Sequence, residues 1–190
     1  MNLIYLHGFQ SSPMSIKGQV LKQAVATRRD IQIHLPDLNM PPYAVMAMLD
    51  DLIQRLDQVA LVGSSLGGFY AAQLAAKHRL PAVLINPAVR PWQLFMDLFG
   101  ESQLPYQVSK TWTLDLQQLQ DLQQIVQPFA QDADKVLVLL QQGDEVLDYR
   151  EAERYYRQSL LIRESDGNHA MDNFKTKIPM LLRFLSDCIK

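Results

Sequence analysis

The stretch LVGSSLGGFY, residues 61–70, breaks an apolar run with two serines among glycines and then resumes as a helix-compatible pattern. Ser65 is the central residue of a G-x-S-x-G pattern whose outer positions are Gly63 and Gly67. This pattern is typical of a sharp turn from a strand into a helix, where a side chain at either glycine would collide with neighbouring backbone. The pattern therefore predicts an outward-pointing Ser65 hydroxyl beside the free N–H groups of a helix start.

The same residues have a second interpretation. A glycine-rich helix start with Ser64 or Ser65 as an ordinary N-cap produces the same five letters. The choice between a nucleophile and an N-cap therefore depends on what the rest of the chain places nearby.

Composition limits the classes of function. The chain has 190 residues, of which 48% are hydrophobic and 20% charged, so we expect one domain, 1–190, with a sizeable core. A net charge of -2 gives no bulk electrostatic reason to bind nucleic acid or an anionic membrane surface. No apolar stretch approaches the roughly 20 residues of a membrane helix, so we expect no membrane partner.

The N-terminus and the cysteine content bear on the compartment. The opening residues, MNLIYLHGF, lack the basic and long apolar regions of a secretory signal. Cys188 is the single cysteine, so an internal disulfide is excluded. We expect a cytoplasmic protein whose partner is a small molecule.

Six short runs predict strands, most of them apolar throughout, as in parallel strands buried on both faces. They are Leu3–Leu6, Ile31–Leu35, Val59–Gly63, Ala82–Asn86, Lys135–Gln141 and Ser159–Glu164. Helical patterns lie between them, at Tyr43–Leu56, Phe69–Lys77, Tyr149–Arg157 and Ile178–Ile189. This alternation predicts an α/β fold with a mostly parallel sheet flanked by helices.

The interval 87–134 is far longer than an ordinary connection, and we expect a helical cap or lid insertion there. One amphipathic pattern in it places four apolar residues at i, i+3, i+4 and i+7: Trp92, Phe95, Met96 and Phe99. A second pattern spaces further apolar residues along one side: Leu116, Leu119, Leu122, Val126 and Phe129. The first stripe has two interpretations, packing on the domain core or lining a substrate entrance.

Two later residues complete the order Ser, Asp, His that accompanies this type of turn. Asp144 follows the last long strand, at the carboxyl end where open α/β sheets gather their ligands. His169 lies in a polar loop before the C-terminal helix. Asp148 and Glu145 are rivals for the acid, but each is explained equally well as a solvated or helix-capping residue, so we favour Asp144.

The other histidines have plainer explanations. His34 falls within a predicted strand and His78 near a helix end, positions typical of structural or surface residues. His7 follows the first strand, and we rank it below His169 as a base.

The segment YLHGFQSSP, residues 5–13, bears on the oxyanion site. A glycine after His7 lets the backbone pass closely, and the N–H of Phe9 is a candidate oxyanion donor beside that of Leu66. In the alternative interpretation this is only a strand end and a polar turn, with Ser11 and Ser12 capping the next helix.

Jointly these motifs resemble the α/β-hydrolase superfamily, and most closely its small bacterial YqiA-like esterases. The resemblance rests on YLHGF, GSSLGG, GDEVLD and GNH and spans nearly the whole chain. It implies a small α/β-hydrolase fold with Ser65 as nucleophile, Asp144 as acid and His169 as base, and with Phe9 and Leu66 as backbone oxyanion donors. Few residues precede the first strand, so we expect the leading antiparallel hairpin of larger hydrolases to be absent.

The activity that the resemblance implies is hydrolysis of small carboxylic esters through an acyl-enzyme, without cofactor or metal. The sequence indeed contains no Walker A lysine, G-x-G-x-x-G motif or metal-ligand spacing. The same triad would also serve a thioesterase, an acyltransferase or a C–C hydrolase. A non-catalytic binding protein of the same fold is a further alternative, against which the presence of all three triad residues argues.

Overall fold

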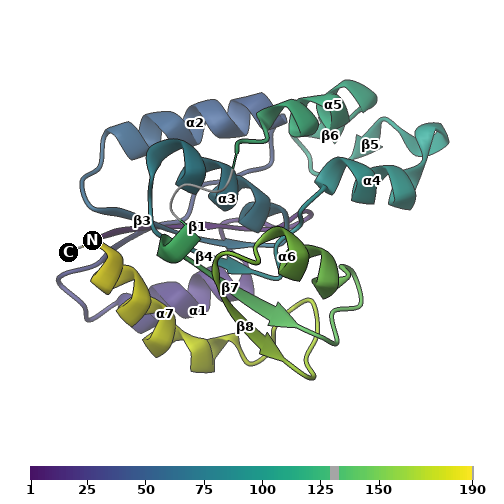
Figure 1. Ribbon diagram of the computed structural model, residues 1–190. Coiled ribbons are helices and arrows are strands. Elements are labelled where there is room, and N and C mark those ends of the chain that lie inside the picture. The colour runs from purple at the N-terminus through teal and green to yellow at the C-terminus, as the bar shows by residue number, and fades with distance from the viewer. Residues whose placement is uncertain (129–132, 190) are drawn as a thin grey trace.

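A parallel sheet forms the centre of the computed structural model, which describes residues 1–128 and 133–189 (Figure 1). Its strand order is β2-β1-β3-β4-β7-β8, and all five neighbouring pairs are parallel. The strands are β1 (Asn2–Leu6), β2 (Gln32–His34), β3 (Val59–Ser64), β4 (Ala82–Ile85), β7 (Val136–Gln141) and β8 (Leu160–Glu164). The expected α/β class with a mostly parallel sheet is confirmed.

Helices cover both faces of this sheet. They are α1 (Ile16–Val25), α2 (Pro42–Gln54), α3 (Leu66–His78), α4 (Pro91–Phe99), α5 (Leu116–Ile125), α6 (Tyr149–Tyr155) and α7 (Phe174–Ile189). Short 3-10 turns lie at Glu101–Gln103 (η1) and Ala133–Lys135 (η2). In Figure 1, α2 and α3 lie on one side of the strands, and α1 and α7 lie on the other.

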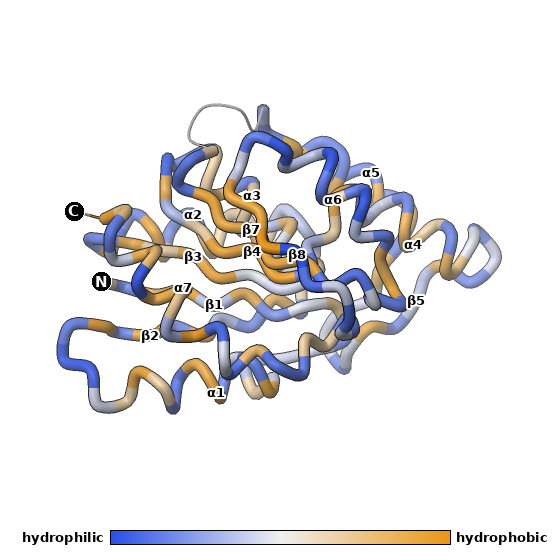
Figure 2. Tube along the Cα trace, turned by 60° about the horizontal axis from the view of Figure 1, so that its bottom comes forward, coloured by the Kyte–Doolittle hydropathy of each residue, from blue (hydrophilic) through white to orange (hydrophobic). Residues whose placement is uncertain are grey.

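Alternating residues of each strand enter two separate core layers. Leu3 and Tyr5 of β1 pack with the apolar faces of α1 and α7, whereas Ile4 and Leu6 pack with α2 and α3. Because both faces are covered, the central strands need apolar residues at every position, which explains the unbroken apolar runs. Figure 2 shows these strands as a hydrophobic centre within a more polar exterior.

Several boundaries differ from the sequence-based expectation. Helix α3 begins at Leu66, directly after Ser65, and α7 begins at Phe174 although it contains Pro179. Ser11 and Ser12 do not cap a helix, since α1 begins later and Ser15 is its N-cap.

The segment between β4 and β7 contains α4, η1, an antiparallel pair of short strands and α5. The short strands are β5 (Tyr106–Gln107) and β6 (Thr113–Leu114). Helix α5 packs against α4 and α2, so the segment is continuous with the core layer on that face. Phe129, the last residue of the second predicted stripe, lies outside the described residues.

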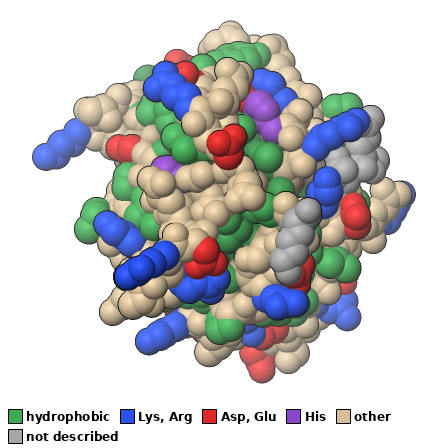
Figure 3. All heavy atoms as spheres, turned by 90° about the vertical axis from the view of Figure 1, so that its left-hand side faces the viewer, with side chains coloured by type: hydrophobic (Ala, Val, Ile, Leu, Met, Phe, Trp, Pro, Cys, Tyr) green, Lys and Arg blue, Asp and Glu red, His purple; other side chains and the backbone are tan. Residues whose placement is uncertain are grey.

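Figure 3 shows the face of the molecule that lies on the left in Figure 1, where positive and negative side chains are interspersed over the surface. This distribution agrees with the small net charge of -2. Among the described helices, none combines the length and the apolarity needed to cross a bilayer.

Candidate active site

Ser65 lies at the turn between β3 and α3 and has φ 56° and ψ -120°. A positive φ is uncommon for a residue with a side chain and costs about 1–3 kcal/mol, so it persists only where the surroundings enforce it. Here they do: a Cβ on Gly63 would lie 2.2 Å from the carbonyl oxygen of Gly67, and one on Gly67 would lie 2.1 Å from that of Leu6. The two outer glycines thus let helix and sheet approach until the chain must reverse at Ser65.

The N-cap interpretation of this turn is only half correct. Ser65 occupies the N-cap position of α3, but its hydroxyl makes no capping hydrogen bond to the described residues. Ser64 is the last residue of β3 and is buried. The Ser65 hydroxyl is therefore not used to cap α3.

Asp144 and His169 lie together at the carboxyl end of the sheet. Nδ1 of His169 is 2.8 Å and 3.0 Å from the two carboxylate oxygens of Asp144. An ionised carboxylate only accepts hydrogen bonds, so Nδ1 carries the ring proton and Nε2 is left as the acceptor. The backbone N–H groups of Val146 and Leu147 each donate to Asp144 at 2.9 Å, which fixes the carboxylate behind the imidazole.

The two rival acids have other partners. Asp148 is the N-cap of α6 and accepts from the N–H of Arg150 at 3.0 Å. Glu145 is exposed, and its carboxylate accepts from the backbone N–H of His169 at 3.0 Å. Glu145 therefore holds the histidine loop through the main chain, and Asp144 alone of the three carboxylates contacts the imidazole.

Ser65 and His169 line the same two cavities. One, which we call the apolar pocket, has a volume of about 430 Å³. Besides Ser65 and His169 its lining is mainly apolar: Phe9, Leu66, Ala88, Pro91, Leu94, Phe95, Leu98, Phe99, Tyr106 and Val146. Both candidate oxyanion residues are thus at the cavity that contains the candidate nucleophile, and the N–H of Leu66 is in the first turn of α3, where amides lack intrahelical acceptors.

The four residues of the predicted α4 stripe separate in the structure. Phe95 and Phe99, four residues apart, lie on the face that lines the apolar pocket. Trp92 and Met96 form the neighbouring row and line a different hollow against α5. Trp92 also packs on Phe69 of α3, with ring centroids 6.3 Å apart. Only half of the stripe is therefore in reach of a substrate at Ser65.

Phe9 is the centre of an aromatic cluster that reaches into the insertion. Its ring centroid is 4.5 Å from that of Phe95, 6.1 Å from Phe99, 6.4 Å from Tyr106 and 6.0 Å from Trp112. Pairs at these separations contribute about 0.5–1.5 kcal/mol each beyond their buried area. The Phe9 ring thereby attaches the loop after β1 to α4 and to the β5–β6 hairpin, and Gln10 of the same loop donates a hydrogen bond to the Tyr106 hydroxyl at 2.7 Å.

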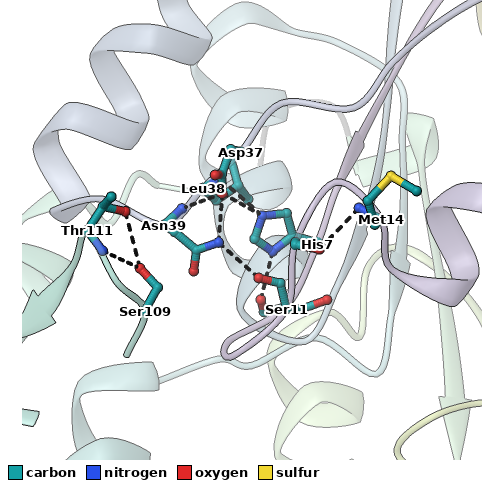
Figure 4. Close-up of polar contacts among 10 residues, drawn as sticks. His7, Ser11, Met14, Asp37, Leu38, Asn39, Ser109 and Thr111 are labelled. Atoms are coloured by element: carbon teal, nitrogen blue, oxygen red, sulfur yellow. Dashed lines mark hydrogen bonds and ion pairs between the residues drawn. The ribbon is translucent and has the colours of Figure 1, made fainter. Parts of the chain in front are cut away.

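His7 is buried and fully engaged (Figure 4). The N–H of Leu38 donates to Nε2 at 3.0 Å, so the ring proton is on Nδ1, which donates to the carbonyl of Gly8 at 2.9 Å. In Figure 4 the imidazole lies between the loop at Asp37 and Leu38 and the loop at Ser11. His7 therefore holds two loops together, with neither ring nitrogen available as a base.

The other two histidines also have local partners. Nε2 of His34 is 3.0 Å from Oδ1 of Asn2, and partial burial lowers the His34 pKa. Nε2 of His78 is 2.6 Å from the carboxylate of Asp50. Across residues 1–128 and 133–189, no three or more His, Cys, Asp and Glu side chains are grouped so as to hold a metal ion.

Asn86 is a site residue that sequence reasoning missed. It directly follows β4, has φ 39° and is 3% exposed. Its amide nitrogen donates to the carbonyls of Asn168 and His169 at 3.1 Å and 3.2 Å, and its oxygen accepts from the N–H of Gln141 at 2.9 Å. One buried amide thus joins the end of β7, from which the Asp144 loop departs, to the His169 loop.

Comparison with known proteins gives the family. The model of the Uncharacterised protein family (UPF0227) matches residues 2–186. The chain belongs to the UPF0227 family. A UPF0227 protein of Citrobacter koseri is 21% identical over 188 residues, covering 96% of this chain and 97% of that protein. One of Shewanella woodyi is 19% identical over 191 residues, covering 96% and 98%. The resemblance to YqiA-like proteins is thereby confirmed at the level of family.

Solved structures confirm the α/β-hydrolase fold for this UPF0227 chain. Est1E from Butyrivibrio proteoclasticus, in a structure with ferulic acid bound, has a TM-score of 0.72 at 16% identity and covers 99% of this chain and 89% of that one. Mouse alpha/beta hydrolase domain-containing protein 10 has a TM-score of 0.73 at 15% identity, covering 100% and 90%. At such low identity the likeness establishes the fold, and the function has to be argued from the site.

Asn86 supplies the first testable prediction. In Asn86→Asp, carboxylate oxygens replace the two N–H donors that face the carbonyls of Asn168 and His169. We expect the free energy of unfolding to fall by about 1–3 kcal/mol, since two partly buried carbonyl groups lose their donor. We also expect faster amide hydrogen exchange at His169 and Met171, measured by NMR or mass spectrometry.

Gln73→Glu is the matched control, because Gln73 is also a buried amide with one backbone acceptor and one backbone donor. It should destabilise the protein without changing exchange in the histidine loop. Equal exchange at His169 in both variants would show that Asn86 does not hold this loop.

Proposed function

We propose that this protein is a serine hydrolase that cleaves small carboxylic esters. The observation that carries the proposal is that Ser65 and His169 line the same two cavities. Ser65 has a strained backbone and a hydroxyl that makes no capping hydrogen bond, and the ring of His169 contacts Asp144. In the proposed reaction the Ser65 hydroxyl attacks the ester carbonyl while Nε2 of His169 accepts its proton. Asp144 keeps the ring in the required tautomer and stabilises its protonated form.

The negative charge of the tetrahedral intermediate needs donors that are already in position. We assign this role to the backbone N–H groups of Phe9 and Leu66, both at the apolar pocket with Ser65. Collapse of the intermediate breaks the ester C–O bond, and the imidazolium returns its proton to the leaving alcohol. Water, activated by His169, then hydrolyses the acyl-enzyme in the same way.

The interval 87–134 is proposed to act as a cap that selects the acyl group. Its helix α4 supplies Phe95 and Phe99 to the apolar pocket, and the hairpin supplies Tyr106. A volume of about 430 Å³ lies toward the small end of ligand pockets, which favours short acyl chains.

The assignment of the nucleophile predicts different fates for the two serines of the turn. Ser65→Ala should lower kcat for a short-chain aryl ester by at least about 10³-fold, because the covalent step is lost. Ser64→Ala should keep most of the activity. A fluorophosphonate should label the parent protein and Ser64→Ala but not Ser65→Ala, as read by intact-mass spectrometry. Labelling at Ser64 instead would refute this assignment.

The assignment of the acid separates two neighbouring aspartates. Asp144→Asn keeps the shape of the side chain but no longer stabilises the protonated imidazole, so kcat should fall about 10³–10⁴-fold. Asp148→Asn, which changes the α6 cap and an exposed ion pair with Arg150, should cost less than about tenfold. Steady-state kinetics on one ester decide between them. Larger loss in Asp148→Asn than in Asp144→Asn would reverse the assignment.

The cap hypothesis is tested on α4. Phe99 is half-buried, so Phe99→Ala enlarges the pocket with less damage to the core than truncation of the fully buried Phe95. We expect the kcat/KM ratio of long to short acyl esters to rise, by about 1–3 kcal/mol in transition-state free energy. Trp92→Ala, on the other row of the same helix, should leave this ratio unchanged. Parent-like chain-length profiles in both variants would mean that Phe99 serves core packing only.

A further inference from the structure

A second cavity meets the apolar pocket at Ser65 and His169. It has a volume of about 660 Å³ and lies between the loop after β1, the start of α1 and the start of α7. Phe9 and Gln10 border both cavities, together with Ser65 and His169. A substrate whose carbonyl carbon is at Ser65 therefore has two separate spaces for its two halves.

The chemistry of this second cavity differs from that of the apolar pocket. Besides the candidate catalytic pair, its polar lining includes Gln10, Ser64, three serines from the segment before α1, two lysines and one aspartate. The last six are Ser11, Ser12, Ser15, Lys17, Lys175 and Asp172. Because it holds two cations against one anion, we call it the lysine pocket. The apolar pocket has no Lys, Arg, Asp or Glu in its described lining.

Of the two lysines, Lys17 gives the clearer indication that the cavity binds an anion. It is in the first turn of α1 and is partly buried, yet its side-chain ammonium makes no hydrogen bond or direct ion pair with any residue in 1–128 or 133–189. Burial lowers its pKa, and the more distant charges of Asp172 and Asp144 act in the opposite direction. Asp172 is itself exposed and accepts a hydrogen bond from Asn168 at 2.8 Å.

A partly desolvated ammonium without a contacting partner is unfavourable, and an anionic group in the cavity would remove that cost. Lys175 is exposed on the first turn of α7 and adds a second positive charge at the rim. Apolar side chains of Tyr5, Val20 and Phe174 also line the cavity, so an anion bound there would be partly shielded from water.

We propose that the lysine pocket binds the leaving group of the substrate, and that this leaving group is a small alcohol carrying a carboxylate or phosphate. The inference rests on the proposed function, since it assigns the two halves of an ester to the two cavities. The acyl half occupies the apolar pocket. When the C–O bond breaks, the alcohol oxygen takes the proton from His169, and the anionic alcohol departs through the lysine pocket.

The test uses esters with one acyl group and different leaving groups. We compare para-butyryloxybenzoate and para-butyryloxyphenyl phosphate with the neutral methyl ester of the first. For each protein the measured quantity is the anionic-to-neutral ratio of kcat/KM, in which the intrinsic reactivity of each ester cancels between variants. The ratio for at least one anion should fall about fivefold or more in Lys17→Gln, and less in Lys175→Gln. High salt should also lower the anionic-to-neutral ratio of the parent protein, because it screens the attraction between the lysines and the anion.

Lys22→Gln is the matched control, since Lys22 is an exposed lysine in the last turn of the same helix and is absent from both cavities. It should keep the parent's ratio for every ester. A Lys17→Gln ratio equal to that of the parent for both anions would overturn the proposal.

A binding measurement separates this proposal from the proposed function. Ser65→Ala protein is titrated with the same three esters by ligand-observed NMR, with and without Lys17→Gln. Tighter binding of an anionic ester that is lost in the Lys17→Gln background supports the lysine pocket even if the parent protein hydrolyses none of them. Equal affinity for anionic and neutral esters in Ser65→Ala protein overturns it, whatever the parent hydrolyses.

Discussion

The close approach of the first turn of α3 to the carboxyl ends of β1 and β3 governs the arrangement of the site. A Cβ at Gly67 would lie 2.1 Å from the Leu6 carbonyl oxygen, and a Cβ at Gly63 would lie 2.2 Å from that of Gly67. Because glycine has no side chain at either position, the helix can begin immediately beyond the sheet. The reversal then falls on Ser65, which adopts φ 56°. The same approach brings the start of α3 beside the loop that carries Phe9, so one packing constraint sets both the serine and its surroundings.

Buried polar side chains hold the remaining loops around this turn. His7 joins the loop after β1 to that at Leu38, and Asn86 joins the histidine loop to the end of β7. Asp144 accepts hydrogen bonds from two N–H groups of its own loop in addition to contacting His169. Irregular backbone near a sheet leaves many N–H and C=O groups in need of partners. These side chains satisfy them while fixing the candidate catalytic groups, which links the stability of the loops to the geometry of the site.

The sequence predicts most of what depends on local pattern. Buried parallel strands read as continuous apolar runs, and the turn at Ser65 has a motif because its steric limits act within a few residues. The sequence pattern predicts the C-terminal helix only from Ile178, whereas α7 begins at Phe174, whose buried ring packs in the same core layer as Ile178. In the sequence Asn86 is only the last residue of a predicted strand. Its hydrogen bonds to Asn168 and His169 were not predicted, because these partners are 82 and 83 residues away. The division of the α4 stripe into two rows could not be predicted either, because the position of α5 in the fold decides which row of α4 residues it covers.

Phe9 connects these levels of organisation. Its ring packs with Phe95, Phe99, Tyr106 and Trp112, all in the insertion, and the residue also lines both cavities at Ser65. Under the proposed mechanism its N–H would stabilise the oxyanion, so the residue that forms the charge-binding site is positioned by the segment that shapes the acyl pocket. An acyl group that displaces those rings would also displace the oxyanion donor. Selection of the acyl group in such an arrangement acts on kcat as well as on KM, because a poorly fitting substrate disturbs the stabilisation of the transition state itself.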